Sequence, residues 1–191
     1  ALAYYETKID YSIYDNDKDG IIDSVWLIYN YDVNYDDDQS DYWAYVYWNV
    51  EADKYDGLEA YTYGFAGTDF MYEETNAYDN SKIIVDAHTF IHETGHMMGL
   101  DDYYDYDTTT GESEGGMYYA DMMDGAIGDH SSISKLLLGW ITPTVVSGNG
   151  SIEINLNAFN TSGDVLLISD HEVKSIYDEY FLIEYYTNDG L

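Results

Sequence analysis

The sequence predicts a mixed α/β domain of the α+β kind, with a twisted sheet, a prominent helix and a β-rich C-terminal segment. Short aromatic and β-branched runs broken by acidic turns fill the first half of the chain, as is typical of strands. A helical hydrophobic period begins near residue 80, and strand-like runs return after residue 141. The 191 residues suit one domain of ordinary size. We expect residues 1–143 to form that domain and residues 144–191 to pack on it or to begin a further one.

The predicted elements are bounded by turn-forming residues. The runs with strand composition are residues 24–31, 42–50, 58–66, 151–159, 164–169 and 179–186. A short helix is predicted over residues 131–140, where Ser131 can act as the N-cap. Pro143, the only proline of the chain, follows that helix and marks the passage into the β-rich segment.

The strongest helical pattern lies in SKIIVDAHTFIHETGHMMGL. Its apolar face, at helical spacing, consists of Ile84, Ala87, Ile91 and Met98. Asn80 or Ser81 can cap the first turn, and Gly99 stands where a left-handed residue would end the helix. The sequence therefore predicts a helix from about residue 81 to residue 98.

The charge balance restricts the partners of the chain. There are 38 acidic residues against six lysines and no arginine, a formal net charge of −32 at pH 7. Nucleic acids and anionic membranes are bound through basic patches, so we predict no nucleic-acid partner and no membrane insertion. Because cysteine is absent, a disulfide framework and thiolate metal sites are excluded. The composition leaves the oligomeric state open.

Within the predicted helix the chain reads His92-Glu93-Thr94-Gly95-His96. Two histidines four residues apart share one helical face, so both imidazoles can reach one cation. Glu93 lies about 100° around the helix, where its carboxylate can act on water without ligating the metal. A zinc ion lowers the pKa of water, and the carboxylate can take the proton as the water attacks a carbonyl. The alternative is a pair of hydrogen-bonded, partly buried histidines.

The continuation of the motif supplies a third ligand. Gly99 lets the chain turn sharply after the helix, so that Asp102 can fold back toward the histidines. Catalytic zinc takes three protein ligands and leaves its fourth position open, and an aspartate oxygen is an acceptable donor. His88, one turn earlier on the same face, we interpret as a packing or supporting residue in preference to a ligand. His130 we interpret as an exposed loop residue, the alternative being a hydrogen-bond donor to the oxyanion of the reaction.

The stretch HETGHMMGLDD resembles the extended zinc signature of the metzincin clan, HExxHxxGxxH, with Asp102 in place of the last histidine. This aspartate variant is found in the immune inhibitor A family and the snapalysins, and the chain is similar to the first of these over more of its length, from about residue 10 to residue 185. The further shared segments are Asp102-Tyr103-Tyr104-Asp105, Asp121-Met122-Met123-Asp124-Gly125, residues 135–140 with Pro143, and residues 180–184.

The resemblance implies a metzincin-like catalytic domain of a secreted, extracellular bacterial zinc endopeptidase that acts on protein or peptide substrates. It also implies that Met123 forms the Met-turn, a hydrophobic floor beneath the metal, although ordinary core packing is compatible with that role. The clan has a tyrosine two residues after this methionine, where the present chain has Gly125. The tyrosines available to stabilise the tetrahedral intermediate instead are Tyr104, Tyr118 and Tyr119.

A second metal site is predicted near the N-terminus, where DNDKDGIID matches the first nine positions of an EF-hand-type calcium loop. The calcium ligands would be Asp15, Asp17, Asp19, the carbonyl oxygen of Ile21, and Asp23. Gly20 stands at the sixth position, which requires a sharp turn. The twelfth position is Trp26 instead of glutamate, and a strand follows instead of a helix. An acidic turn that binds no cation is the alternative.

Two other functions agree with the residues. A non-catalytic, metal-stabilised extracellular binding domain would explain the 24 tyrosines as a surface for glycans or protein partners. Glu93 argues against it, because a purely structural zinc site has no use for this carboxylate. An enzyme acting on a non-peptide amide is the third interpretation. The chain opens without a signal peptide, so we expect a fragment or processed form of a longer precursor.

Overall fold

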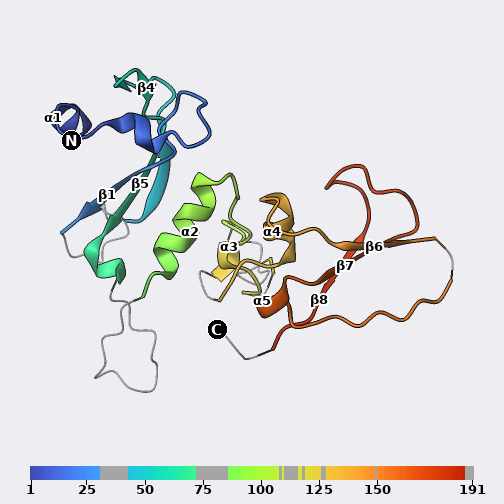
Figure 1. Ribbon diagram of the computed structural model, residues 1–191. Helices are drawn as coiled ribbons and strands as arrows, with labels where there is room; N and C mark the ends of the chain where they lie inside the picture. The colour runs from blue at the N-terminus through green and yellow to red at the C-terminus, as the bar shows by residue number, and fades with distance from the viewer. Residues whose placement is uncertain are drawn as a thin grey trace. The chain divides into compact units, whose positions relative to one another are not determined.

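The structure is a computed structural model that describes residues 1–30, 43–71, 86–107, 109, 116–117, 119–125, 128–148 and 150–187. The chain forms two compact units, Ala1–Gly99 and Leu100–Leu191 (Figure 1). Both contain a small sheet and short helices, so the predicted mixed α/β class is confirmed. The assignment of residues 1–143 and 144–191 to a domain and an added segment stays a prediction.

The first unit is built on a three-stranded sheet in the order β1-β5-β2. These strands are β1 (Val25–Tyr29), β5 (Thr62–Gly67) and β2 (Tyr45–Trp48), with β1 parallel and β2 antiparallel to β5. The hairpin of β3 (Lys54–Tyr55) and β4 (Leu58–Glu59) precedes β5. Strands therefore form within all three runs predicted in the first half, although residues 58–66 belong to two strands instead of one.

Helix α2 (His88–Met97) packs on this sheet, beside β5 and β2 (Figure 1). A close approach is made possible by Gly64 in β5, because a Cβ there would lie 2.2 Å from Met97 Cε and 2.9 Å from the Trp26 ring. The Trp26 and Phe90 rings meet at a centroid distance of 5.1 Å. They cover a core of Ala44, Ala66 and Phe70. The close packing against the sheet therefore fixes the position of α2 within this unit.

The ends of α2 differ in how well they were predicted. The helix begins at His88 with Ala87 as its N-cap residue, so the predicted start at residue 81 is wrong. Asp86 Oδ1 accepts the His88 N–H at 2.9 Å and satisfies one amide of the first turn. Asn80, Ser81 and Ile84 lie outside the described residues. Gly99 has a φ of +97°, which confirms the left-handed residue predicted at the C-terminal end.

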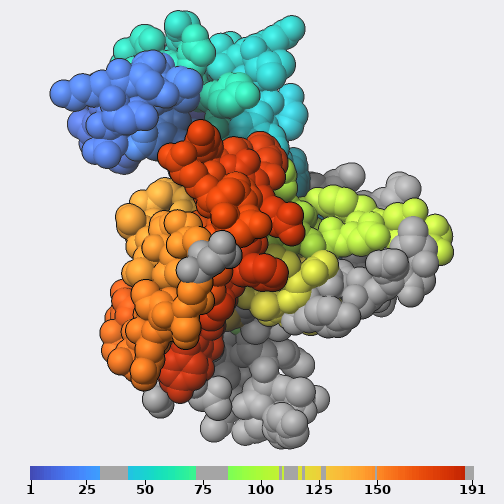
Figure 2. Space-filling view, turned by 90° about the vertical axis from the view of Figure 1, so that its right-hand side faces the viewer, coloured from blue at the N-terminus to red at the C-terminus, as the bar shows by residue number. Residues whose placement is uncertain are grey.

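A second core in the same unit joins the N-terminal segment to the hairpin. Tyr11, Ile22 and Ala60 are its buried members. Tyr11 belongs to the 3-10 helix η1 (Tyr11–Tyr14), which follows α1 (Leu2–Tyr5). The segment Thr68–Met71 after β5 is a further 3-10 helix, η2. Figure 2 shows the blue N-terminal residues packed against the cyan and green ones of this unit.

The second unit contains a three-stranded sheet in the order β6-β7-β8. Its strands are β6 (Thr144–Ser147), β7 (Val165–Ser169) and β8 (Phe181–Glu184), with β6 parallel and β8 antiparallel to β7. The helices are α3 (Met122–Gly125), α4 (Ser132–Leu137) and α5 (Phe159–Ser162). The Ser132 N–H donates to Glu184 Oε2 at 2.7 Å and ties the start of α4 to β8.

Of the elements predicted after residue 130, one helix and two strands are confirmed, the strand over residues 151–159 is not, and β6 lies outside the predicted runs. Helix α4 and strands β7 and β8 lie within the predicted ranges. The predicted strand over residues 151–159 is wrong, because residues 151–158 are irregular and Phe159 begins α5. Asn157 donates from both its backbone and its side chain to Asp164 Oδ2, which turns the chain into that helix. None of the described helices is long and apolar enough to span a membrane.

Candidate metal centre

His92 and His96 project from the same face of α2, as their spacing predicted. Their ring centroids are 4.8 Å apart and the rings are nearly perpendicular, with an interplanar angle of 89°. His92 is buried and His96 is half-buried. Glu93, between them in the sequence, is 7% exposed. A glutamate is rarely buried to this extent without a polar partner or a functional requirement.

The structure brings Asp102 together with the two histidines. One potential ligand atom from each of His92, His96 and Asp102 lies within 4.8 Å of the other two. A tetrahedral zinc ion with ligand distances of about 2.0–2.2 Å would hold such atoms about 3.3–3.6 Å apart, which lies inside this limit. Two imidazole nitrogens with one carboxylate oxygen are also donors that zinc accepts. The three residues therefore fit the metal that the motif predicts.

Asp102 is held by a tyrosine that the sequence did not single out. The Tyr106 hydroxyl donates to Asp102 Oδ2, which fixes one oxygen of the carboxylate. The ring of Tyr104 meets that of Tyr106 at a centroid distance of 5.2 Å. Burial, followed by the charge of Asp102 and a hydrogen bond to its carboxylate, raises the pKa of Tyr104 above the ordinary value. With 24 tyrosines in the chain, only the four-residue spacing from Asp102 to Tyr106 could have pointed to this pair.

Met123, the predicted Met-turn residue, is fully buried in the short helix α3. Its N–H donates to Asp121 Oδ1 at 2.7 Å. Beside it, a Cβ at Gly125 would lie 2.2 Å from Tyr119 Cδ1, so the Tyr119 ring fills the space next to this glycine. Tyr118 lies outside the described residues. The burial of Met123 agrees both with a hydrophobic floor and with ordinary packing.

Two further histidines have other partners. His88 Nδ1 lies 3.0 Å from Asp86 Oδ1, and His88 is not among the grouped ligands. His130 is 4% exposed, so its interpretation as an exposed loop residue is wrong. Its ring packs edge-on against Trp140 at 5.9 Å, and its Nδ1 lies 3.8 Å from Asp121 Oδ1. His130 is thus part of the interior of the second unit.

The predicted calcium loop forms a tight turn closed by its own hydrogen bonds. Asp15, Asp17 and Asp19 each offer an oxygen within 4.8 Å of the others. Asp15 accepts N–H groups of Asp19 and Gly20, at 3.1 and 3.2 Å, and Gly20 has the positive φ, +90°, that its sharp turn requires. Of the two remaining predicted ligands, Asp23 does not belong to this group. Ile21 forms a bridge to Glu59, and Asp23 Oδ1 accepts the Asn16 N–H at 3.3 Å. The calcium assignment stays a prediction.

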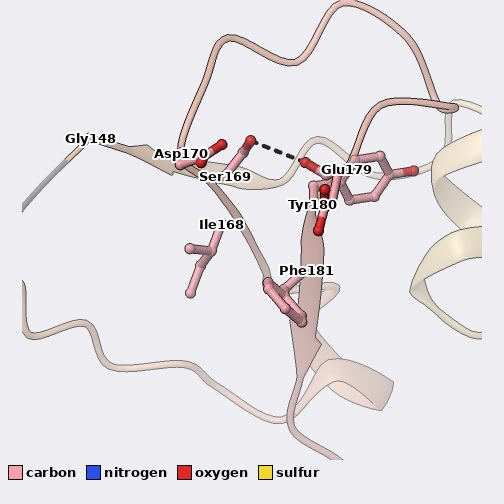
Figure 3. A pocket seen from close by; sticks show the side chains of 7 residues that line it. All are labelled: Gly148, Ile168, Ser169, Asp170, Glu179, Tyr180 and Phe181. Carbon is pink, nitrogen blue, oxygen red and sulfur yellow. Dashed lines mark hydrogen bonds between the residues drawn. The ribbon is translucent and has the colours of Figure 1, made fainter.

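The second unit also contains an open pocket of about 300 Å³ at the ends of β7 and β8 (Figure 3). The lining residues are Gly148, Ile168, Ser169, Asp170, Glu179, Tyr180 and Phe181. The Ser169 hydroxyl donates to the Glu179 carbonyl at 3.1 Å across it. None of the predicted site residues lines this pocket, so it has no part in the candidate metal centre.

Comparisons of the chain with models of protein families, with curated proteins and with solved structures find no match. The resemblance to the immune inhibitor A family therefore stays a prediction carried by the sequence motif. The function has to be argued from the residues of the site.

Proposed function

We propose that the chain is a zinc-dependent endopeptidase that hydrolyses peptide bonds. The observation that carries the proposal is the grouping of ligand atoms from His92, His96 and Asp102, together with the burial of Glu93 on the same helix as the two histidines. Three ligands with an open fourth position characterise catalytic zinc, whereas structural sites use four protein ligands. The buried glutamate next to the first histidine is the additional group that hydrolysis needs.

The residues have separate tasks in this proposal. His92, His96 and Asp102 would hold zinc, which supplies an electrophile that lowers the pKa of water and polarises the scissile carbonyl. The Glu93 carboxylate accepts the proton of the attacking water and passes it to the leaving amine. Tyr106 keeps the Asp102 carboxylate oriented through its hydrogen bond. Water is the nucleophile, so no covalent enzyme intermediate forms.

Further features of the proposal depend on the resemblance alone. They are a metzincin-like arrangement of the catalytic domain, a Met-turn at Met123, and secretion from a bacterial cell. Structural calcium in the loop of Asp15 is proposed from the spacing of its aspartates. Exposed carboxylates in that loop would otherwise repel one another, which favours a cation there. The proposed substrates are proteins or peptides.

A non-catalytic extracellular binding domain is the second candidate. Exposed aromatic rings on and beside β2 favour it: Trp43, Tyr47 and Trp48 are 50%, 52% and 43% exposed. Such a domain would retain zinc without turnover. The two candidates therefore differ in the consequence of changing Glu93.

Replacing Glu93 with glutamine tests the proposal. We expect zinc content to stay at about one per chain, while the rate of casein hydrolysis falls by about 10²–10⁴-fold, the usual contribution of a general base. Mass spectrometry gives the metal content, and a zinc chelator defines the metal-dependent rate. Glu51→Gln, an exposed glutamate in the first unit, is the matched control and should leave the rate unchanged. Undiminished turnover in Glu93→Gln would contradict the mechanism, and a wild-type chain that holds zinc without turnover would favour the binding domain.

A further inference from the structure

Asp121 has the lowest exposure of the described carboxylates, 0%. Its Oδ1 accepts the Met123 N–H at 2.7 Å, and its Oδ2 accepts the N–H and hydroxyl of Ser131 at 2.8 and 2.6 Å. The Ser134 hydroxyl donates to the same Oδ2 at 2.7 Å. Burial raises the pKa of Asp121, whereas the neighbouring His130 imidazole and the hydrogen bonds lower it, and the lowering prevails. The carboxylate is therefore ionised at neutral pH and fully engaged.

This cluster extends to Tyr103, the residue after the proposed ligand Asp102. The Ser134 hydroxyl also hydrogen-bonds the Tyr103 hydroxyl, at 3.0 Å. The Tyr103 N–H donates to the Met123 carbonyl at 2.9 Å, and its own carbonyl accepts the Gly116 N–H at 3.2 Å. Tyr103 is thus fixed at its amide, its carbonyl and its phenol. Two of these three points lead back to Asp121, through Met123 and through Ser134.

We propose that Asp121 is a positioning residue that fixes Asp102, the third ligand of the zinc site, through Tyr103 and Met123. This inference rests on the proposed function. Consecutive Cα atoms are about 3.8 Å apart, so a fixed Tyr103 leaves the backbone of Asp102 little freedom. Metal sites require their ligands within about 0.5 Å of the productive geometry. Loss of the groups behind a ligand typically lowers metal affinity by about 10–100-fold.

The test is Asp121→Asn in the full chain. Both carboxylate oxygens accept backbone N–H groups, from Met123 and Ser131. An amide of the same shape must therefore turn its NH₂ group against one of these donors. We expect zinc affinity, measured by competition with a chromophoric chelator, to fall by about 10–100-fold in folded protein. The visible absorption of the cobalt-substituted chain should change as well, because it reports ligand geometry and not stability.

Two other variants keep the test decisive. Asp124→Asn changes a different buried carboxyl group, in α3, whose Oδ2 accepts the Tyr119 N–H, and should keep wild-type zinc affinity and cobalt absorption. Tyr103→Phe removes only the phenol link and should lower zinc affinity by a smaller factor. It serves if Asp121→Asn fails to fold.

The outcomes separate this inference from the proposed function. Wild-type zinc affinity and cobalt absorption in folded Asp121→Asn, or in Tyr103→Phe if the first does not fold, would overturn the inference alone. A wild-type chain that binds zinc but does not hydrolyse peptides would overturn only the proposed activity. A wild-type chain that binds no zinc would overturn both.

Discussion

His92 and His96 project from a ten-residue helix seated on a sheet, whereas Asp15, Asp17 and Asp19 project from a loop. The first pair is buried or half-buried, and two of the three aspartates are exposed. A helix fixes its side chains before any ligand arrives, so zinc binding should require little rearrangement of α2. An exposed loop of like charges gains order from the cation itself. The comparison predicts a preformed zinc half-site and a calcium loop that responds to its ion.

The largest effect is expected from His96→Ala, which leaves a single imidazole on α2. Loss of a direct ligand should reduce zinc affinity by more than about 100-fold, beyond the range for groups that only support a ligand. Competition with a chromophoric chelator measures it. His88→Ala is the matched control, because His88 lies on the same helix and pairs with Asp86. Equal losses in both variants would mean that the helix was disturbed and not the site.

Asp17→Asn tests the other half of the comparison. If the loop binds calcium, the ion at one hundred times its Kd should stabilise the wild-type chain by about 2.7 kcal/mol. The variant should lose most of this gain, which thermal unfolding with and without calcium would reveal. Glu172→Gln, an exposed change in the second unit, should keep it. No stabilisation of the wild-type chain by calcium would leave an acidic turn as the better interpretation.

Gly64→Ala tests whether α2 packs against β5 as closely as the structure indicates. The new Cβ would lie 2.9 Å from two atoms of the Trp26 ring, which cannot move as freely as the end of Met97. Overpacking of this kind costs about 1–3 kcal/mol, and denaturant unfolding would measure the loss. Gly57→Ala is not a matched control, because Gly57 has a positive φ of +85° and would be strained for another reason. An undiminished free energy of unfolding would show that α2 can shift on its sheet.

The grouping of the two histidines could be predicted from the sequence because its geometry is local. Four-residue spacing on a helix places His92 and His96 together, and Gly99 alone supplies the turn after them. The network behind Asp102 could not be predicted. Its link from Ser134 to Tyr103 joins residues 31 positions apart, and no periodicity indicates such a contact.

Strand prediction met a similar limit. Ile152, Ile154 and Leu156 alternate with polar residues as in a half-buried strand. A strand nevertheless needs a partner, and the pairing of β7 is taken by β6 and β8. Asn157 instead bonds to Asp164 and turns the chain into α5. The two strands that pair with β7 are separated from each other by more than thirty positions of sequence. Local sequence patterns therefore could not predict which strands pair with β7.

Tyr106→Phe should have the smallest effect and sharpens the comparison at the ligand itself. The variant removes the hydroxyl that donates to Asp102 Oδ2 and keeps the ring that packs against Tyr104. A ligating carboxylate that loses one supporting hydrogen bond should bind zinc about tenfold more weakly, at the low end of the range for such partners. Tyr177→Phe, at a tyrosine 91% exposed, is the control for loss of a hydroxyl. Zinc affinity equal to wild type in Tyr106→Phe would mean that this hydroxyl does not orient Asp102, and that Tyr104 and the backbone beside Tyr103 hold the carboxylate without it.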